Sequence, residues 1–126
     1  MGISTEIDRE SGLRIHVVTG RLTMEDLIGS LEKVYSRPDY DPAMNVLWDL
    51  RDADFSAFVS PQIQQVRDFV TSNWGTEGTS HAAMVVSSDE AFGLMRMYEF
   101  YLKQKSRNEV QVFRDYDEAL DWITKK

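Results

Sequence analysis

The feature that most constrains the fold is an alternation of short apolar runs with longer segments whose apolar residues keep helical spacing. Two of the runs, Val46–Trp48 and Ala82–Val86, are apolar throughout, which is typical of strands buried on both faces. The segments between the runs place apolar side chains three and four residues apart, as amphipathic helices do. Because strands separated by helices favour parallel pairing through right-handed crossovers, the sequence predicts a layered α/β fold.

The two ends of the chain complete the predicted sheet. Two short strands, Ile3–Arg9 and Leu13–Val18, are predicted on either side of a Ser-Gly turn, which is typical of a β-hairpin. A last strand is predicted at Val110–Phe113. We therefore expect one mixed β-sheet of about five strands, with an antiparallel hairpin first and a β-α-β-α-β-α order after it. Residues 1–126 are expected to form a single domain.

Four helices are predicted around this sheet. Apolar spacing predicts the first over Thr23–Ser36, with its first residue as the N-cap. Residues Arg51–Val59 are predicted to be a loop, and the Ser60–Pro61 pair after them is typical of a helix start. A third helix is predicted over Asp89–Gln104, and Asp115 is the predicted cap of the last one.

Composition excludes several classes of function. The chain has no cysteine, so disulfides, thiolate chemistry and cysteine-bound metals are excluded. Its formal charge is −7 and its basic residues are scattered, whereas nucleic-acid binding needs a clustered basic face. The sequence shows neither a signal peptide nor an apolar stretch long enough to span a membrane. We expect a cytoplasmic protein with no nucleic-acid partner and no integral membrane segment.

The sequence does not assemble a catalytic or cofactor site. Of the two histidines, His16 is predicted on a strand and His81 just before one, and neither has an adjacent serine nucleophile. No metal-ligand spacing and no G-x-G-x-x-G pattern is present. Three aspartates, Asp49, Asp52 and Asp54, could offer oxygen ligands to Mg²⁺ or Ca²⁺, but a solvated acidic turn is the expected alternative. We therefore expect no enzyme activity, no cofactor and no metal.

The helix over Ala91–Leu102 carries more apolar side chains than one sheet-facing stripe needs. The stripe can be formed by Ala91, Leu94, Tyr98 and Tyr101. The residues predicted to extend beyond the stripe, and therefore to form an interface or contact an apolar ligand, are Phe92, Met95, Met97, Phe100 and Leu102. Three alternatives remain open: a helix fully covered within the monomer, a homodimer face, or an apolar pocket.

Several segments, in their order and spacing, carry a resemblance to a known family. They are Gly20–Thr23 with Asp26-Leu27, Pro38–Asp41, Trp48–Ser56, and Val112–Tyr116 leading into Glu118–Trp122. The chain resembles the SpoIIAA-like family, relatives of the STAS domain of sulfate transporters and anti-sigma-factor antagonists. The resemblance implies an α/β fold with a mixed sheet, close to the lipid-binding CRAL-TRIO fold, and does not imply an enzyme.

The same resemblance points to a candidate switch loop. STAS antagonists dock on a partner kinase, which phosphorylates a serine in an Asp-Ser-Ser-Gly motif after the central strand. The comparable segment here is Asp52–Ser56, which is longer and has neither the double serine nor the glycine. The candidate residues for phosphorylation or switching are Ser56, Asp49 and Arg51, although like charge from the neighbouring aspartates disfavours a phosphate on Ser56.

Three hypotheses of function follow from these observations, and the third is a hydrolase or transferase whose catalytic residues would come together only in the fold. The first is a non-enzymatic interaction module that self-associates, as a homodimer, or docks on a protein partner through the Phe92–Leu102 helix. The alternative is a module that binds or carries a small apolar, lipid-like ligand in a CRAL-TRIO-like pocket.

Overall fold

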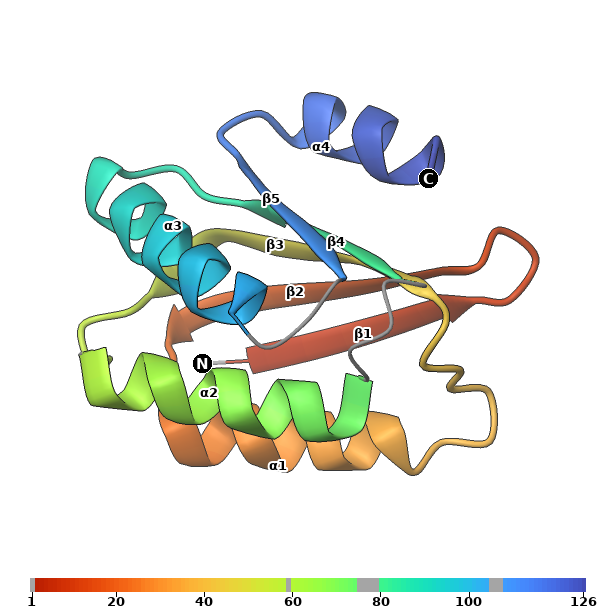
Figure 1. Ribbon diagram of the computed structural model, residues 1–126, viewed down its shortest axis with the longest axis horizontal. Helices are drawn as coiled ribbons and strands as arrows, with labels where there is room; N and C mark the ends of the chain where they lie inside the picture. The colour runs from red at the N-terminus through yellow and green to blue at the C-terminus, as the bar shows by residue number, and fades with distance from the viewer. Residues whose placement is uncertain (1, 59, 75–79, 105–107) are drawn as a thin grey trace.

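Five strands form one mixed sheet in the order β1-β2-β3-β4-β5 (Figure 1). The computed structural model describes residues 2–58, 60–74, 80–104 and 108–126. The strands are β1 (Gly2–Asp8), β2 (Leu13–Arg21), β3 (Asn45–Asp54), β4 (His81–Val85) and β5 (Glu109–Phe113). β1 runs antiparallel to β2, and every other neighbouring pair is parallel. The predicted mixed sheet with an N-terminal hairpin is therefore confirmed.

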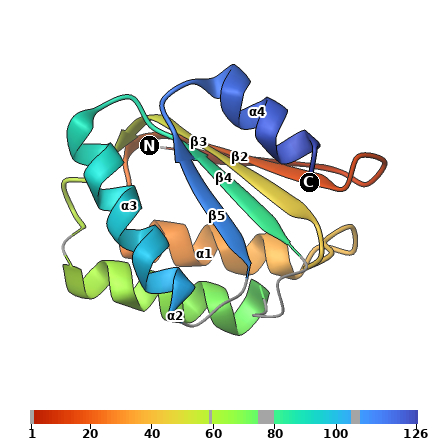
Figure 2. The ribbon, with the colours of Figure 1, turned by 45° about the horizontal axis from the view of Figure 1, so that its top comes forward.

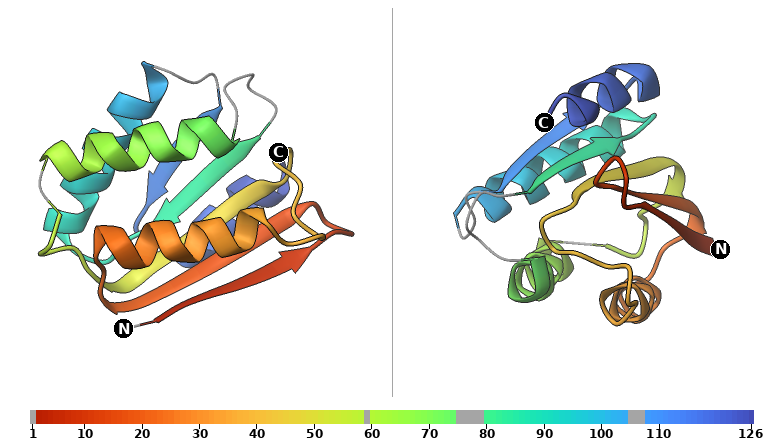
Figure 3. Two further views of the ribbon diagram at one scale, coloured as in Figure 1. Left: turned by 90° about the horizontal axis from the view of Figure 1, so that it is seen from below. Right: turned by 90° about the vertical axis from the view of Figure 1, so that its right-hand side faces the viewer.

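Helices cover both faces of this sheet, but unequally. They are α1 (Met24–Tyr35), α2 (Ser60–Trp74), α3 (Asp89–Lys103) and α4 (Tyr116–Thr124). Because the parallel strands follow one another across the sheet, right-handed crossovers place α1, α2 and α3 on the same face. α4 follows the last strand and packs on the opposite face (Figures 2 and 3).

Side-chain caps fix the starts of three helices. The Thr23 hydroxyl accepts a hydrogen bond from the Asp26 amide at 3.1 Å, and the Ser88 hydroxyl accepts one from the Ala91 amide at 3.1 Å. An Asp115 carboxylate oxygen accepts the Glu118 amide at 3.0 Å. These bonds satisfy amide groups that have no partner within the helix. The predicted caps at positions 23 and 115 are confirmed.

The predicted loop over Arg51–Val59 is wrong in its first half, because β3 continues to Asp54. The reason is backbone pairing with the end of β2, which also continues past its predicted end at Val18. Beyond an irregularity in the register after Val17, Thr19 pairs with Asp52 and the pairing continues to the end of both strands. Paired backbone groups thus hold an exposed, polar segment in a strand.

Two apolar cores lie on the two faces of the sheet. The larger core lies under α1, α2 and α3, and includes Val18, Leu31 and Leu102. The smaller one lies under α4, where Leu47 packs with Ile123. Alternate residues of β3 enter alternate cores, as the pleat requires. In the described part of the chain, no helix has the length and apolar character needed to cross a membrane.

Candidate functional site

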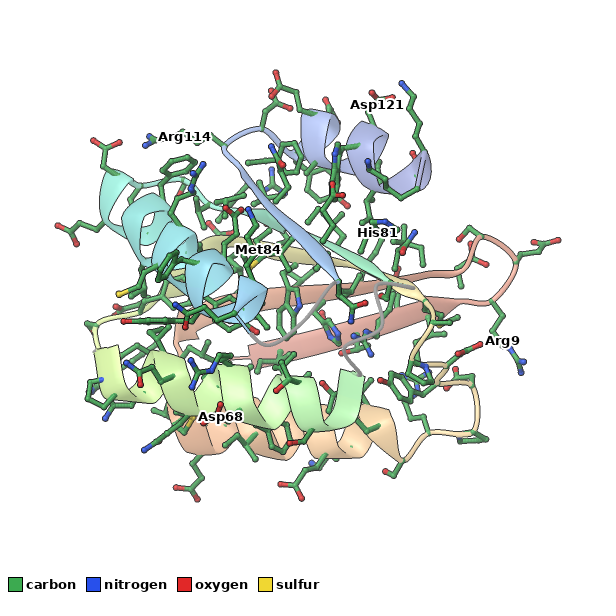
Figure 4. All side chains as sticks on the ribbon, in the orientation of Figure 1. Arg9, Asp68, His81, Met84, Arg114 and Asp121 are labelled. Carbon is green, nitrogen blue, oxygen red and sulfur yellow. The ribbon has the colours of Figure 1, made fainter. Side chains whose placement is uncertain are left out.

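A cavity of about 80 Å³ lies between the sheet and the helices α1, α2 and α3. Strands supply part of its lining through Val46 and Met84, and the helices supply residues such as Leu31 and Ile63. Met84 lies on β4 in the space between the sheet and α3 (Figure 4). Almost all of the lining is apolar, so the cavity is suited to an apolar group.

The structure divides the five singled-out residues of α3 into two sets. Met95 and Leu102 are 5% and 1% exposed and line the cavity, so the prediction that they extend beyond the sheet-facing stripe is wrong. The stripe is turned relative to the predicted one because α3 also packs against α2. Phe92 and Met97 are half-buried, and Phe100 is 59% exposed. The outer face of α3 therefore offers a smaller apolar area than the sequence indicated.

Phe92 is further covered by a charged neighbour. The Arg114 guanidinium lies 4.5 Å from the centre of the Phe92 ring, and the same guanidinium donates to Asp89 at 2.6 Å. Arginine packs favourably on an aromatic face in this way. On the outer face of α3, this leaves Phe100 as the exposed large apolar side chain among the described residues.

Arg14 is the charged residue among the described residues that line the cavity. It lies on β2 between Leu13 and Ile15, which face the core under α4, so its own side chain faces the opposite side. Arg14 is only 3% exposed. Its guanidinium lies 5.1 Å from the Tyr40 ring centre and 5.8 Å from that of Tyr35. Within the described residues, its Nε and Nη1 atoms have no hydrogen-bond partner.

A second buried polar residue of β2, His16, follows on the same face. Its Nδ1 atom shares a hydrogen bond of 2.7 Å with the Thr5 hydroxyl, and its ring stacks on Trp48 with centroids 4.1 Å apart. Burial, and then the nearby positive charge of Arg14, hold the pKa of His16 well below its usual value. His16 is therefore neutral at neutral pH. Its Nε2 atom, like the two Arg14 nitrogens, is unpaired within the described part of the chain.

Two tyrosines, Tyr35 and Tyr98, also line the cavity. Burial raises the pKa of Tyr35 to about 12, against an opposing effect of Arg14. Burial and the neighbouring Tyr35 also raise the pKa of Tyr98 above its ordinary value. Both hydroxyls therefore stay protonated and can donate hydrogen bonds at neutral pH. The described residues hold no group of three or more carboxylate or imidazole side chains arranged for a metal ion.

Sequence reasoning missed Arg14, Tyr35 and Tyr98 as parts of one site. The signal at Arg14 was present but ambiguous, because a polar residue between two apolar ones on a strand ordinarily faces solvent. Only the packing of α1 against the sheet shows that both faces of β2 are covered. The two tyrosines lie 63 residues apart on different helices, so no local pattern joins them.

Comparisons with known proteins give a result at the level of the fold. No family model matches the chain, and no curated protein matches it in sequence. Among solved structures, it is similar to an uncharacterised protein of the DUF3478 family with a SpoIIAA-like fold from Shewanella loihica PV-4. The TM-score is 0.61 with 17% identity, over 97% of this chain and 92% of the other. The chain has a SpoIIAA-like fold.

Within this SpoIIAA-like fold, the candidate switch residues Asp49 and Arg51 lie in β3, and Ser56 lies beyond its end. Arg51 holds Asp49 with two hydrogen bonds of 2.8 Å and also lies over the Tyr116 ring at 4.8 Å. The Arg51 hydrogen bonds lower the pKa of Asp49. Ser56 is exposed, and its amide donates to Asp54 at 2.9 Å. The structure thus brings Asp49 and Arg51 together and places Ser56 in a separate turn.

Proposed function

We propose that this chain is a non-catalytic binding module that holds a small, mainly apolar ligand between its sheet and the helices α1, α2 and α3. The observation that carries the proposal is the cavity of about 80 Å³ with an almost wholly apolar lining. A cavity of that volume has room for about five to eight water-sized groups. The ligand, or the part of it inside the cavity, is therefore short.

Packing energetics support a ligand of this kind. Loss of packing contacts around an apolar cavity of this size costs on the order of 2 kcal/mol, and a bound apolar group restores those contacts. Met84 of β4 and Met95 of α3, which both line the cavity, have flexible and polarizable side chains that adapt to different shapes. The lining is thus suited to related small ligands rather than to one rigid shape.

The titratable groups of the lining favour binding over catalysis. Acid–base catalysis works best with a group whose pKa lies near the working pH. Arginine stays charged in proteins, and the raised pKa values keep Tyr35 and Tyr98 neutral at that pH. Among the described lining residues no other side chain titrates. The site can orient a ligand, but its lining provides no proton donor or acceptor poised for chemistry at neutral pH.

The proposal is tested by native mass spectrometry of freshly purified protein, together with xenon binding measured by ¹²⁹Xe NMR. We expect a co-purified small molecule in the wild type, and xenon binding once that molecule has been removed. Both should be lost in Ala82→Leu, which fills the cavity from β4 and should unfold at the same or a higher temperature. A wild type that carries no ligand and binds xenon no better than Ala82→Leu would contradict the proposal.

A second candidate function, docking through the outer face of α3, is favoured by one observation. Phe100 is 59% exposed, and the half-buried Met97 lies on the same helix. We propose a second copy of the chain as the partner to test first. Analytical ultracentrifugation at micromolar concentration should then show a dimer that Phe100→Asp dissociates. A strictly monomeric wild type would remove this candidate.

A further inference from the structure

We propose that the ligand of this cavity is a short-chain carboxylate, whose negative charge pairs with the buried guanidinium of Arg14. The inference rests on the proposed function, since it names the chemical class of the ligand. The juxtaposition that carries it is one buried cation at the wall of an apolar cavity.

The positive charge of Arg14 is buried. Removing a cation from water costs several kcal/mol, so buried charges in proteins are paired. Arg14 is only 3% exposed. No carboxylate of the described residues forms an ion pair with it. The rings of Tyr35 and Tyr40 offset only part of this cost through cation–π contact. This cation–π stabilisation is less than the cost of burying the charge. A bound anion that is not one of the described residues is therefore favoured.

The charge and geometry of the site determine which anion fits. Phosphate carries up to two negative charges near neutral pH, and its sites gather several cations or backbone amides. Here Arg14 is the single charged side chain among the described residues of the lining. One guanidinium matches one carboxylate in charge and in planar, two-bond geometry. A monoanionic carboxylate is therefore favoured over phosphate.

The apolar lining beyond Arg14 determines the remainder of the ligand. Apolar side chains such as Val46, Met84 and Leu102 line the cavity beyond Arg14, and the volume accepts only a short chain. Tyr35 and Tyr98 belong to the same lining, and their protonated hydroxyls are able to donate to an oxygen atom. A carboxylate head with an aliphatic tail of a few carbons satisfies both the charge and the apolar wall. Hexanoate is a suitable probe.

The test compares hexanoate with hexanamide, which has the same shape but no charge, by isothermal titration calorimetry. In the wild type we expect hexanoate to bind at least ten-fold more tightly than hexanamide. The preference should disappear in Arg14→Met, which keeps a long side chain without the charge. It should persist in Arg9→Met, a matched control at the exposed hairpin turn (Figure 4). Circular dichroism checks that both variants fold.

Three results would overturn the inference in distinguishable ways. Equal affinity for hexanoate and hexanamide in the wild type, which needs no variant, leaves a cavity that binds apolar groups without selecting a carboxylate. Displacement of hexanoate by equimolar inorganic phosphate shows that the site selects phosphate instead. If hexanoate, hexanamide and xenon all fail to bind, the proposed function fails together with this inference.

Discussion

At the scale of single residues, the most informative side chains are two polar residues of β2 that are buried. Arg14 and His16 both face the side of the sheet that α1 covers, and both are more than nine-tenths buried. In an isolated strand the same side chains would face water. Their unpaired nitrogen atoms mark the place where the described residues do not satisfy their own polar groups.

The lowered pKa of His16 predicts a loss of stability in mild acid. Below pH 6.5 the unfolded chain binds a proton on this imidazole, whereas the folded chain holds it neutral. The free energy of unfolding should therefore fall as the pH decreases through that range. His16→Asn, whose amide can replace Nδ1 in the bond to Thr5, should flatten this fall.

Urea unfolding followed between pH 7.5 and pH 5 measures the effect. His81→Asn, at the partly buried second histidine, is measured alongside as the matched control. Parallel pH profiles for the wild type and His16→Asn would show that this imidazole is not held neutral by burial.

At the scale of elements, the sequence predicted those features that depend only on residue type and spacing within one segment. The caps at Thr23 and Asp115 and the apolar runs of β3 and β4 follow from residue type and spacing, and the structure confirms them. The extension of β3 to Asp54 was missed because its polar residues carry no apolar period. The orientation of α3 was missed because it depends on contact with α2, which a single segment does not encode.

The packing of α4 on the second face of the sheet leads to a prediction about stability. Ile123 of α4 is 1% exposed and packs with Leu47 and Val85. Ile123→Ala should lower the free energy of unfolding by about 3 kcal/mol, because it removes buried methyl groups and leaves a cavity. Chemical denaturation measures this loss.

Asp121→Ala, on the exposed side of the same helix, is the matched control (Figure 4). It removes a surface ion pair with Lys125 and should cost less than about 1 kcal/mol. Equal effects of the two substitutions would mean that α4 does not cover the sheet as described.

At the scale of the whole molecule, the asymmetry of the two faces explains where the site lies. One helix covers a small core on one face, while α1, α2 and α3 cover the other, with α1 and α2 nearly parallel and α3 at an angle to them (Figure 3). Helices that cross at different angles do not fill the space above a twisted sheet evenly. The cavity lies in that space. No sequence pattern predicts its volume, because it depends on how three separate helices pack.

The most direct test of ligand binding in the cavity is ¹³C-methyl NMR of methionine-labelled protein titrated with hexanoate. Met84 and Met95 line the cavity, whereas Met44 is buried elsewhere and Met97 lies on the outer part of α3. Saturating hexanoate should shift the methyl signals of Met84 and Met95 and leave those of Met44 and Met97 in place. Shifts confined to Met97, or no shifts at all, would contradict a ligand between the sheet and its three helices.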